Sequence, residues 1–177
     1  IFTRGEDPKI LEYYYQTSDV VGIGGLVAPP KNKGFVKGIM KHVGDRKVHW
    51  LGFTSLPFLK VYKPYMADSS SWMSGLRYAS CGLYLGGGKP LVMLQKKTIR
   101  EQLKTEEIRR AILNLNLNPD DFLNPENWVG NKSMTAKVGA RSAVKMSMDI
   151  EKNIGTKQFL AAAADWGVQL LLEGLRK

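Results

Sequence analysis

The sequence predicts an α/β fold, namely the C-terminal portion of a (β/α)8 TIM-type barrel followed by an α-helical extension. Over residues 1–68, short apolar runs alternate with segments of helical pattern, and the connections between them are short. This alternation indicates βαβ units and a parallel sheet. A flavodoxin-like or Rossmann sheet shows the same alternation, but here each unusual residue set directly follows a strand. Because reactive groups collect at the C-terminal strand ends of barrels, this placement favours a barrel.

The predicted strands are brief apolar runs, too short for helices and bounded in part by glycine. They cover residues 1–3, 20–24, 48–53 and 65–68, and the last of them ends at Asp68. These runs lack the polar alternation of a sheet that is wetted on one side. We therefore expect both faces of the sheet to be covered.

Helix-start and helix-stop signals separate these strands. Asp7 is expected to cap the first helix, with Pro8 at its first helical position. The other two helices are predicted at residues 35–43, ended by Gly44, and from residues 55–57 to a stop at Pro64. Residues 28–34 form a loop by composition.

The second half of the chain has a different character. Residues 86–88 form a glycine-rich connection, and beyond residue 90 the pattern becomes helical and charged. Helices are predicted at residues 98–116, 136–153 and 156–172, with turn signals at 118–121 and 124–127. The predicted division is therefore residues 1–90 as the barrel portion and residues 91–177 as a mostly α-helical extension. We expect the extension to pack on the barrel or to grip a substrate.

The chain is strongly basic, with 26 Lys and Arg against 16 Asp and Glu, a net charge of +10 and a pI near 9.7. Such an excess favours an anionic partner, with nucleic acid first and an acidic membrane surface second. The alternative is a basic protein whose charge serves no particular partner. The charge is clustered, however, in a stretch relieved only by Asp45: Lys31, Lys33, Lys37, Lys41, Arg46 and Lys47.

Several classes of site are disfavoured. Cys81 is the only cysteine, which excludes an internal disulfide framework and a cysteine-rich zinc site and fits a reducing, cytoplasmic compartment. The two histidines, His42 and His49, have no metal-ligand spacing, so we expect no metal site and no cofactor. No window reaches the roughly 18 apolar residues of a membrane span. The start at Ile1 leads us to expect further residues upstream.

Two residue sets at predicted strand ends could carry chemistry. The glycines of residues 22–25 leave backbone N–H groups open to a ligand, or they simply form a tight turn. Asp68, followed by Ser69, Ser70 and Ser71, could act as nucleophile, general base or metal ligand, or could cap the next helix. His42 is expected to be solvated, and His49 to be a hydrogen-bonded structural residue.

The order of four segments resembles the tRNA-guanine transglycosylase superfamily, and most closely its phage and bacterial branch, which inserts 7-deazaguanines into DNA. The segment at residues 1–5 is similar to the strand that ends in a Gln-Gly pair in the family, with Arg4 in place of Gln. Residues 21–26 resemble the glycine-pair strand that binds the base. Residues 48–52 and 65–69 resemble the next strand and the strand that ends in the nucleophilic aspartate. The resemblance covers about residues 1–85.

This resemblance implies base exchange, in which a guanine in nucleic acid is replaced by a 7-deazaguanine such as preQ0 through a covalent aspartyl-glycosyl intermediate. It makes Asp68 the nucleophile. The residues that would bind the base are Gly24, Gly25, Leu26, Leu51 and Gly52. The residues that would contact the phosphates are Lys31, Lys33, Lys37, Lys41, Arg46, Lys47 and Arg77.

The chain also departs from the family. It cannot build the three-cysteine, one-histidine zinc site of the tRNA enzymes, so we expect no zinc, and DNA rather than tRNA as substrate. The general-base aspartate and one wall of the base pocket of the family lie on earlier strands, which are absent here, so we expect this chain by itself to be an incomplete catalyst and part of a longer enzyme. The resemblance further implies a virus-encoded protein acting in the host cytoplasm, with a homo-oligomer or larger assembly left open. Two alternatives remain: a non-catalytic nucleic-acid-binding or viral assembly module, and an unrelated barrel enzyme that binds a phosphorylated metabolite at Gly24 and Gly25.

Overall fold

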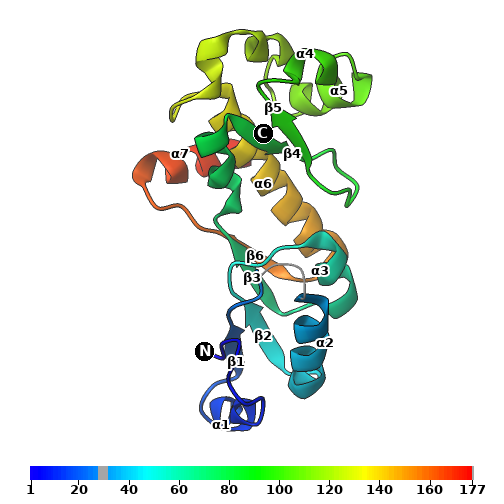
Figure 1. Ribbon diagram of the computed structural model, residues 1–177, viewed down its shortest axis with the longest axis vertical. Helices are drawn as coiled ribbons and strands as arrows, with labels where there is room; N and C mark the ends of the chain where they lie inside the picture. The colour runs from blue at the N-terminus through cyan, green and yellow to red at the C-terminus, as the bar shows by residue number, and fades with distance from the viewer. Residues whose placement is uncertain (28–31, 177) are drawn as a thin grey trace. The chain divides into compact units, whose positions relative to one another are not determined.

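The structure is a computed structural model that describes residues 1–27 and 32–176, without the side chains of residues 32, 74, 76 and 77. The chain divides into two compact units, one made of residues 1–69 and 150–159 and the other of residues 70–149 and 160–177 (Figure 1). The fold is mixed α/β. The sequence predicted a division at residue 90, but the continuous part of the first unit ends at residue 69. The first unit also includes residues 150–159, from the second half of the chain.

The first unit is built on a four-stranded sheet in the order β1-β2-β3-β6. Its strands are β1 (Val20–Ile23), β2 (Lys47–Trp50), β3 (Met66–Ser69) and β6 (Lys157–Leu160). The pairs β1–β2 and β2–β3 are parallel, with Val20 opposite Lys47 and His49 opposite Met66. Phe2 forms a parallel bridge to Ile23, so the segment predicted as a strand at residues 1–3 does pair with β1.

Three helices connect these strands: α1 (Ile10–Thr17), α2 (Asn32–Val43) and α3 (Leu56–Tyr62). The predicted ends of α2 and α3 are confirmed. Gly44 follows α2 with φ 59°, and Lys63 follows α3 with φ 43°, directly before Pro64. Asp7 does accept a hydrogen bond from the backbone N–H of Lys9, at 3.0 Å, but regular helix begins only at Ile10. The loop predicted at residues 28–34 lies partly outside the described residues.

The two faces of the sheet differ in burial. Along β1, β2 and β3, buried and half-buried or exposed residues alternate. The buried set is Val21, Ile23, Val48, Trp50, Ala67 and Ser69. Helices α2 and α3 lie on the same side of the sheet (Figure 1), and Val36, Ile39 and Leu59 are buried there. The expectation that both faces are covered was therefore wrong for these strands, because the opposite face carries His49, Met66 and Asp68 partly exposed.

The segment predicted as a helix at residues 156–172 begins instead with a strand. Gly155, with φ 86°, ends α6, and β6 then pairs beside β3, where the N–H of Lys157 donates to the carbonyl of Tyr65 at 3.1 Å. Regular helix resumes only in α7 (Asp165–Leu175). The alanine-rich run at residues 161–164, between β6 and α7, is neither strand nor helix despite its helical propensity.

The second unit combines a hairpin with helices. Strands β4 (Ser80–Leu83) and β5 (Val92–Gln95) are antiparallel, and the connection between them contains the predicted glycine run, whose three residues all have positive φ. The predicted helix at residues 98–116 is divided at Thr105. The helical elements are η1 (Ser71–Tyr78), α4 (Ile99–Gln102), α5 (Glu106–Leu113), η2 (Pro119–Leu123), η3 (Pro125–Trp128), α6 (Met134–Ile154) and α7. Among the described residues, no helix is both long enough and apolar enough to cross a membrane.

Candidate active site

Asp68 lies on the half-exposed face of the sheet, near the carboxyl end of β3. Its Oδ1 accepts a hydrogen bond of 2.8 Å from the backbone N–H of Gly52, the second residue after β2. Its Oδ2 lies 2.9 Å from Nε2 of His49, and each of the two side chains is 26% exposed. Both carboxylate oxygens are thus held by neighbours from β2 and its following turn. Asp68 does not cap the next helix, because η1 begins after Ser70.

His49 is the neighbour that the sequence did not assign to the site. Its Nε2 is buried and has no aligned hydrogen bond within the described residues, although it lies close to Oδ2 of Asp68. The exposed part of the side chain therefore belongs to the other ring atoms. The ring of Phe159, on β6, lies beside it with centroids 6.0 Å apart. The contact therefore limits where the Asp68 carboxylate can lie, without a well-directed hydrogen bond.

The two glycines after β1 have different roles. The N–H of Gly24 donates to the carbonyl of Phe2 at 2.8 Å, so it is not free to bind a base. Gly25 has φ +71°, and a Cβ there would lie 2.9 Å from Cβ of Arg4, so the position requires glycine. Within the described residues the N–H of Gly25 has no partner. Leu26 is fully buried, and its side chain belongs to the core.

The backbone of Leu51 bonds to the end of β1, and its side chain lies on the half-exposed face of the sheet. Its N–H donates to the carbonyl of Ile23 at 3.0 Å. Its Cδ1 would lie 3.3 Å from a Cβ placed on Gly22, so the leucine side chain covers that glycine. Gly52, with φ +68°, then turns the chain so that its N–H meets Asp68. The predicted residues Leu51, Gly52 and Asp68 therefore come together, and His49 joins them.

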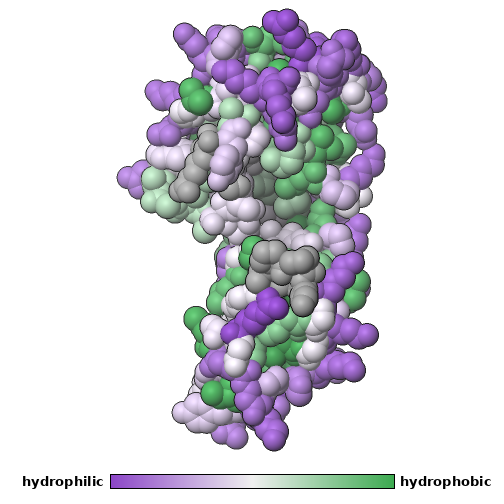
Figure 2. All heavy atoms as spheres, viewed as in Figure 1, coloured by the Kyte–Doolittle hydropathy of each residue, from purple (hydrophilic) through white to green (hydrophobic). Residues whose placement is uncertain are grey.

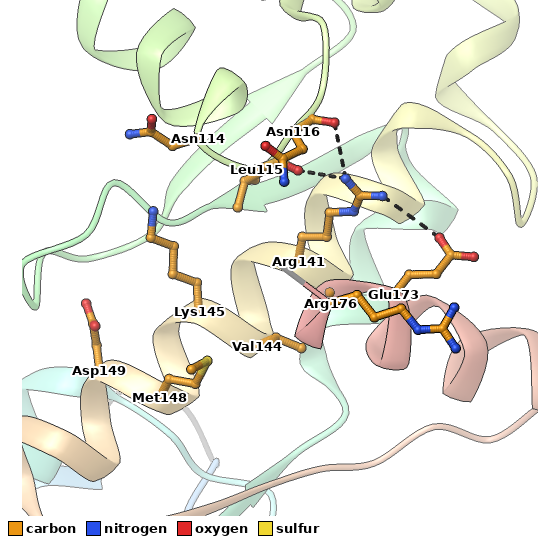
Figure 3. Close-up of a pocket in the computed structure, with 11 residues that line it drawn as sticks. Asn114, Leu115, Asn116, Arg141, Val144, Lys145, Met148, Asp149, Glu173 and Arg176 are labelled. Carbon is orange, nitrogen blue, oxygen red and sulfur yellow. Dashed lines mark hydrogen bonds and ion pairs between the residues drawn. The ribbon is translucent and has the colours of Figure 1, made fainter.

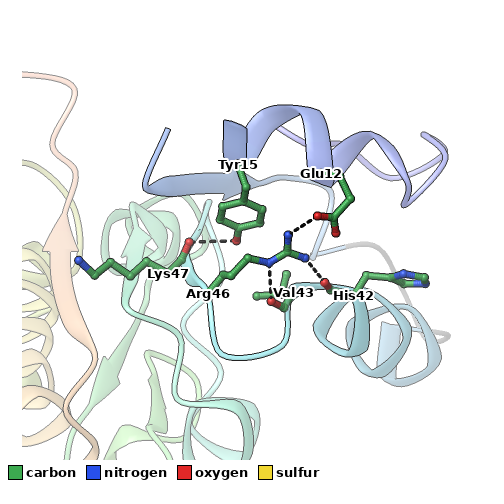
Figure 4. Close-up of polar contacts among 6 residues, drawn as sticks. All are labelled: Glu12, Tyr15, His42, Val43, Arg46 and Lys47. Carbon is green, nitrogen blue, oxygen red and sulfur yellow. Dashed lines mark hydrogen bonds and ion pairs between the residues drawn. The ribbon is translucent and has the colours of Figure 1, made fainter. Parts of the chain in front are cut away.

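The predicted basic residues separate into two groups. Lys33, Lys37 and Lys41 are exposed on α2, whereas Lys31 and the side chain of Arg77 lie outside the described residues. Arg46 is engaged: its guanidinium lies 4.2 Å from the centroid of the Tyr15 ring and contacts Glu12 at 2.9 Å (Figure 4). The same guanidinium donates to the backbone carbonyls of His42 and Val43.

Lys47 lies at the first position of β2, at the amino edge of the sheet and away from Gly52. Its Nζ lies 5.2 Å from the centroid of the Tyr65 ring. Lys157 donates to the hydroxyl of Tyr65 at 2.9 Å, and this hydrogen bond lowers the pKa of the phenol, with a smaller lowering from the charge of Lys47. These two lysines thus surround a tyrosine at the edge opposite Asp68.

The remaining candidates for a reactive or binding site are Cys81, a metal cluster and a pocket in the second unit, and each is less well supported. Burial raises the pKa of the Cys81 thiol to about 12, so this cysteine is no nucleophile at neutral pH. Within the described residues, no cluster of three or more His, Cys, Asp or Glu side chains could hold a metal ion. A pocket of about 390 Å³ in the second unit lies between α5, α6 and α7 (Figure 3). Its Arg141 already donates to the carbonyls of Leu115 and Asn116.

Comparison with known proteins adds no assignment: no protein-family model, no curated protein and no solved structure matches this chain.

Proposed function

We propose that this chain carries the nucleophile of a base-exchange transglycosylase, which replaces guanine in nucleic acid, with DNA the expected substrate, by a 7-deazaguanine. The observation that supports it most is the Asp68 carboxylate, which stands on the half-exposed face at a strand end and is fixed by the Gly52 N–H and His49. Parallel strands with helices on one face, and a carboxylate near the carboxyl end of a strand, are the arrangement in which barrel enzymes place their reactive groups. The resemblance in residues 1–85 supplies the reaction class.

The proposed reaction begins when a guanosine is turned out of the nucleic acid, an opening that costs a few kcal/mol. A carboxylate oxygen of Asp68 attacks C1′ of the sugar, and the bond from C1′ to the guanine N9 breaks with its electron pair. The guanine takes a proton from water and leaves, and Asp68 is now an ester of the sugar. The incoming deazaguanine gives its N9 proton to water, N9 attacks C1′, and the Asp68 carboxylate is released.

The neighbours of Asp68 have distinct tasks in this proposal. A carboxylate oxygen has two lone pairs, so the hydrogen bond from the Gly52 N–H leaves a second lone pair on Oδ1 for the attack, and His49 makes no aligned hydrogen bond to Oδ2. Leu51, which covers Gly22 on the same face, would pack against the base, and the unpartnered N–H of Gly25 would bind its edge.

The test is incorporation of labelled preQ0 into DNA, with tRNA in parallel, by the wild-type protein and by Asp68→Asn. Asp45→Asn is the matched control, because it removes the same charge from an exposed position. We expect Asp68→Asn to lower incorporation by about 10³-fold or more, as for loss of a nucleophile, and the control to match wild type. Thermal unfolding establishes that both variants are folded. Equal incorporation by wild type and Asp68→Asn would remove Asp68 as nucleophile.

A second candidate function is nucleic-acid binding without chemistry, which the exposed lysines of α2 favour. It predicts affinity that falls steeply with salt and that does not change in Asp68→Asn. Binding of a phosphorylated metabolite at the glycine pair is less well supported, because the N–H of Gly24 is already bonded to Phe2.

A further inference from the structure

Helix α2 carries an exposed row of positive charge. Lys33, Lys37 and Lys41 recur at every fourth residue and are all exposed, and α2 contains no acidic residue. Successive lysines are therefore about 6 Å apart along the helix axis and lie on neighbouring positions of one surface. Among the described residues, none of the three forms a salt bridge. We call this the lysine row.

Three residues of α2 lower the stability of the helix. Lys33 occupies the first turn, where the helix dipole favours an acidic residue. Gly34 and Gly38 stand next to lysines on the exposed side, and each glycine costs about 1 kcal/mol relative to alanine in a helix. Neither glycine has a positive φ, and a Cβ at either position would meet no atom within 4 Å. Neither backbone conformation nor packing therefore requires them.

We propose that the lysine row is the surface on which the phosphodiester backbone of a nucleic acid lies. Its unpaired and evenly spaced ammonium groups match a polyanion with evenly spaced phosphates. The glycines beside them have no side chain, so a nucleic-acid strand can approach the main chain of the helix closely. Because α2 runs from the carboxyl end of β1 to the amino end of β2, Lys33 is the member of the row nearest the edge that holds Asp68.

Insertion into a membrane does not fit this surface. An amphipathic helix that lies in the membrane interface inserts its apolar face between the lipids. The apolar face of α2 is already used, because Val36, Ile39 and Val43 are at most 2% exposed in the core of the first unit. The lysine row would then hold the nucleic-acid substrate of the proposed base exchange. Only the identity of the polyanion rests on that function, since binding needs no chemistry at Asp68.

The first experiment compares two triple variants that each remove three positive charges. Lys33, Lys37 and Lys41 are replaced by Gln in one, and the exposed Lys9, Lys97 and Lys132 in the control. Affinity for duplex and single-stranded DNA is measured by fluorescence anisotropy over a range of salt concentrations. We expect the lysine-row variant to lose at least about tenfold in affinity, and the slope of log K against log salt to fall by about 2 to 3. The control should change much less.

The second experiment separates binding from helix stability. Gly34→Ala and Gly38→Ala should each raise the melting temperature, because alanine is the better helix former, and should nevertheless weaken DNA binding. Gly38→Gln, with a longer neutral side chain, should weaken binding more. A purely structural role for the glycines predicts no loss of affinity in any of these variants.

Equal affinity and equal salt slope in the two triple variants would overturn the proposal. So would a loss of binding to vesicles of anionic lipid in the lysine-row variant with DNA binding unchanged. Base exchange by wild type, measured beside DNA binding by the lysine-row variant, keeps the two proposals apart. If DNA binding depends on the lysine row but no base exchange occurs in wild type, the proposed function fails and this inference stands. If base exchange occurs and the lysine row does not affect DNA binding, only this inference fails.

Discussion

In the sheet of the first unit, the amino ends of the parallel strands (the amino edge) and their carboxyl ends (the carboxyl edge) differ in how their polar groups are engaged. At the amino edge, cations and tyrosines satisfy one another: Arg46 stacks on Tyr15 and bonds to backbone carbonyls, and Tyr65 lies between Lys47 and Lys157 (Figure 4 shows the Arg46 group). At the carboxyl edge, Asp68 is held in place but keeps free lone pairs. A charged side chain can therefore bind a ligand only if its neighbours in the structure do not already engage it.

The same contrast separates α2 from the helices of the second unit. There, several exposed cations are paired with acids, as in Lys104 with Glu101, Arg109 with Asp120 and Lys89 with Glu107. Hydrophilic residues cover the α4–α5 end in Figure 2, but they carry both signs of charge. Such exposed pairs contribute only about 0 to 1 kcal/mol each. A charged surface is thus suited to bind a polyanion only where its positive side chains are not paired with acidic ones.

After Asp68→Asn, the largest effect is expected from His49. His49→Phe removes the contact to Oδ2 of Asp68 and should lower kcat for base exchange by about 10- to 100-fold, because a misplaced reacting group is costly. KM should change little if His49 only positions the carboxylate. His49→Gln, which restores a polar side chain, should recover part of the rate. His42→Phe, at the only other histidine, is the control and should match wild type. A normal kcat in His49→Phe would show that Gly52 alone positions Asp68.

Gly25→Ala should destabilise the first unit by about 1 to 3 kcal/mol, because it strains a positive φ and brings a Cβ against Arg4. Gly44→Ala provides the comparison, since Gly44 has a positive φ but no atom within 4 Å of a Cβ. Its loss should be smaller. Denaturant unfolding measures both. An equal loss in the two variants would mean that the contact with Arg4 contributes nothing.

Arg46 and Lys37 should show opposite behaviour. Arg46→Gln removes hydrogen bonds to two backbone carbonyls and should lower the free energy of unfolding by about 1 to 2 kcal/mol. It should leave the salt dependence of DNA binding nearly unchanged. Lys37→Gln should leave stability within about 0.5 kcal/mol of wild type and weaken binding. The contrast between an engaged and an unpaired cation would fail if Arg46→Gln weakened binding as much as Lys37→Gln without destabilising the fold.

The smallest effect concerns Tyr65. The hydrogen bond from Lys157 lowers the pKa of the phenol, so its ionised form is favoured in the folded state. The resulting stabilisation is present above the ordinary pKa of tyrosine and is lost as the pH falls through the lowered value. Lys157→Met should therefore move one tyrosine titration to higher pH, measured by ultraviolet absorbance. An unchanged titration would show that Lys157 does not bond to Tyr65 in solution.

Much of the first unit could be predicted from local signals. Gly44 and Pro64 mark the ends of α2 and α3 because each residue type forbids or discourages further helix. Asp68 was placed at a strand end because an apolar run stops there. These features depend on the residues at hand and on their immediate neighbours, and a single sequence carries that information.

The rest depends on contacts between distant segments. The approach of His49 to Asp68 follows from the register of β2 and β3, with His49 opposite Met66, and no local signal sets that register. The bond from Gly24 to Phe2 requires the bridge between residues 2 and 23. β6 has helical propensity just after it and forms a strand only because β3 offers an edge. The engagement of Arg46 by Tyr15 and Glu12 requires α1 to fold back on the start of β2.

The most direct measurement of the central claim is a search for the covalent intermediate. The protein is incubated with DNA, digested with protease and nuclease, and analysed by mass spectrometry. We expect a sugar-phosphate adduct on the peptide that contains Asp68, absent in Asp68→Asn and removed when a 7-deazaguanine is added. An adduct on any other residue, or base exchange that proceeds in Asp68→Asn, would contradict the account.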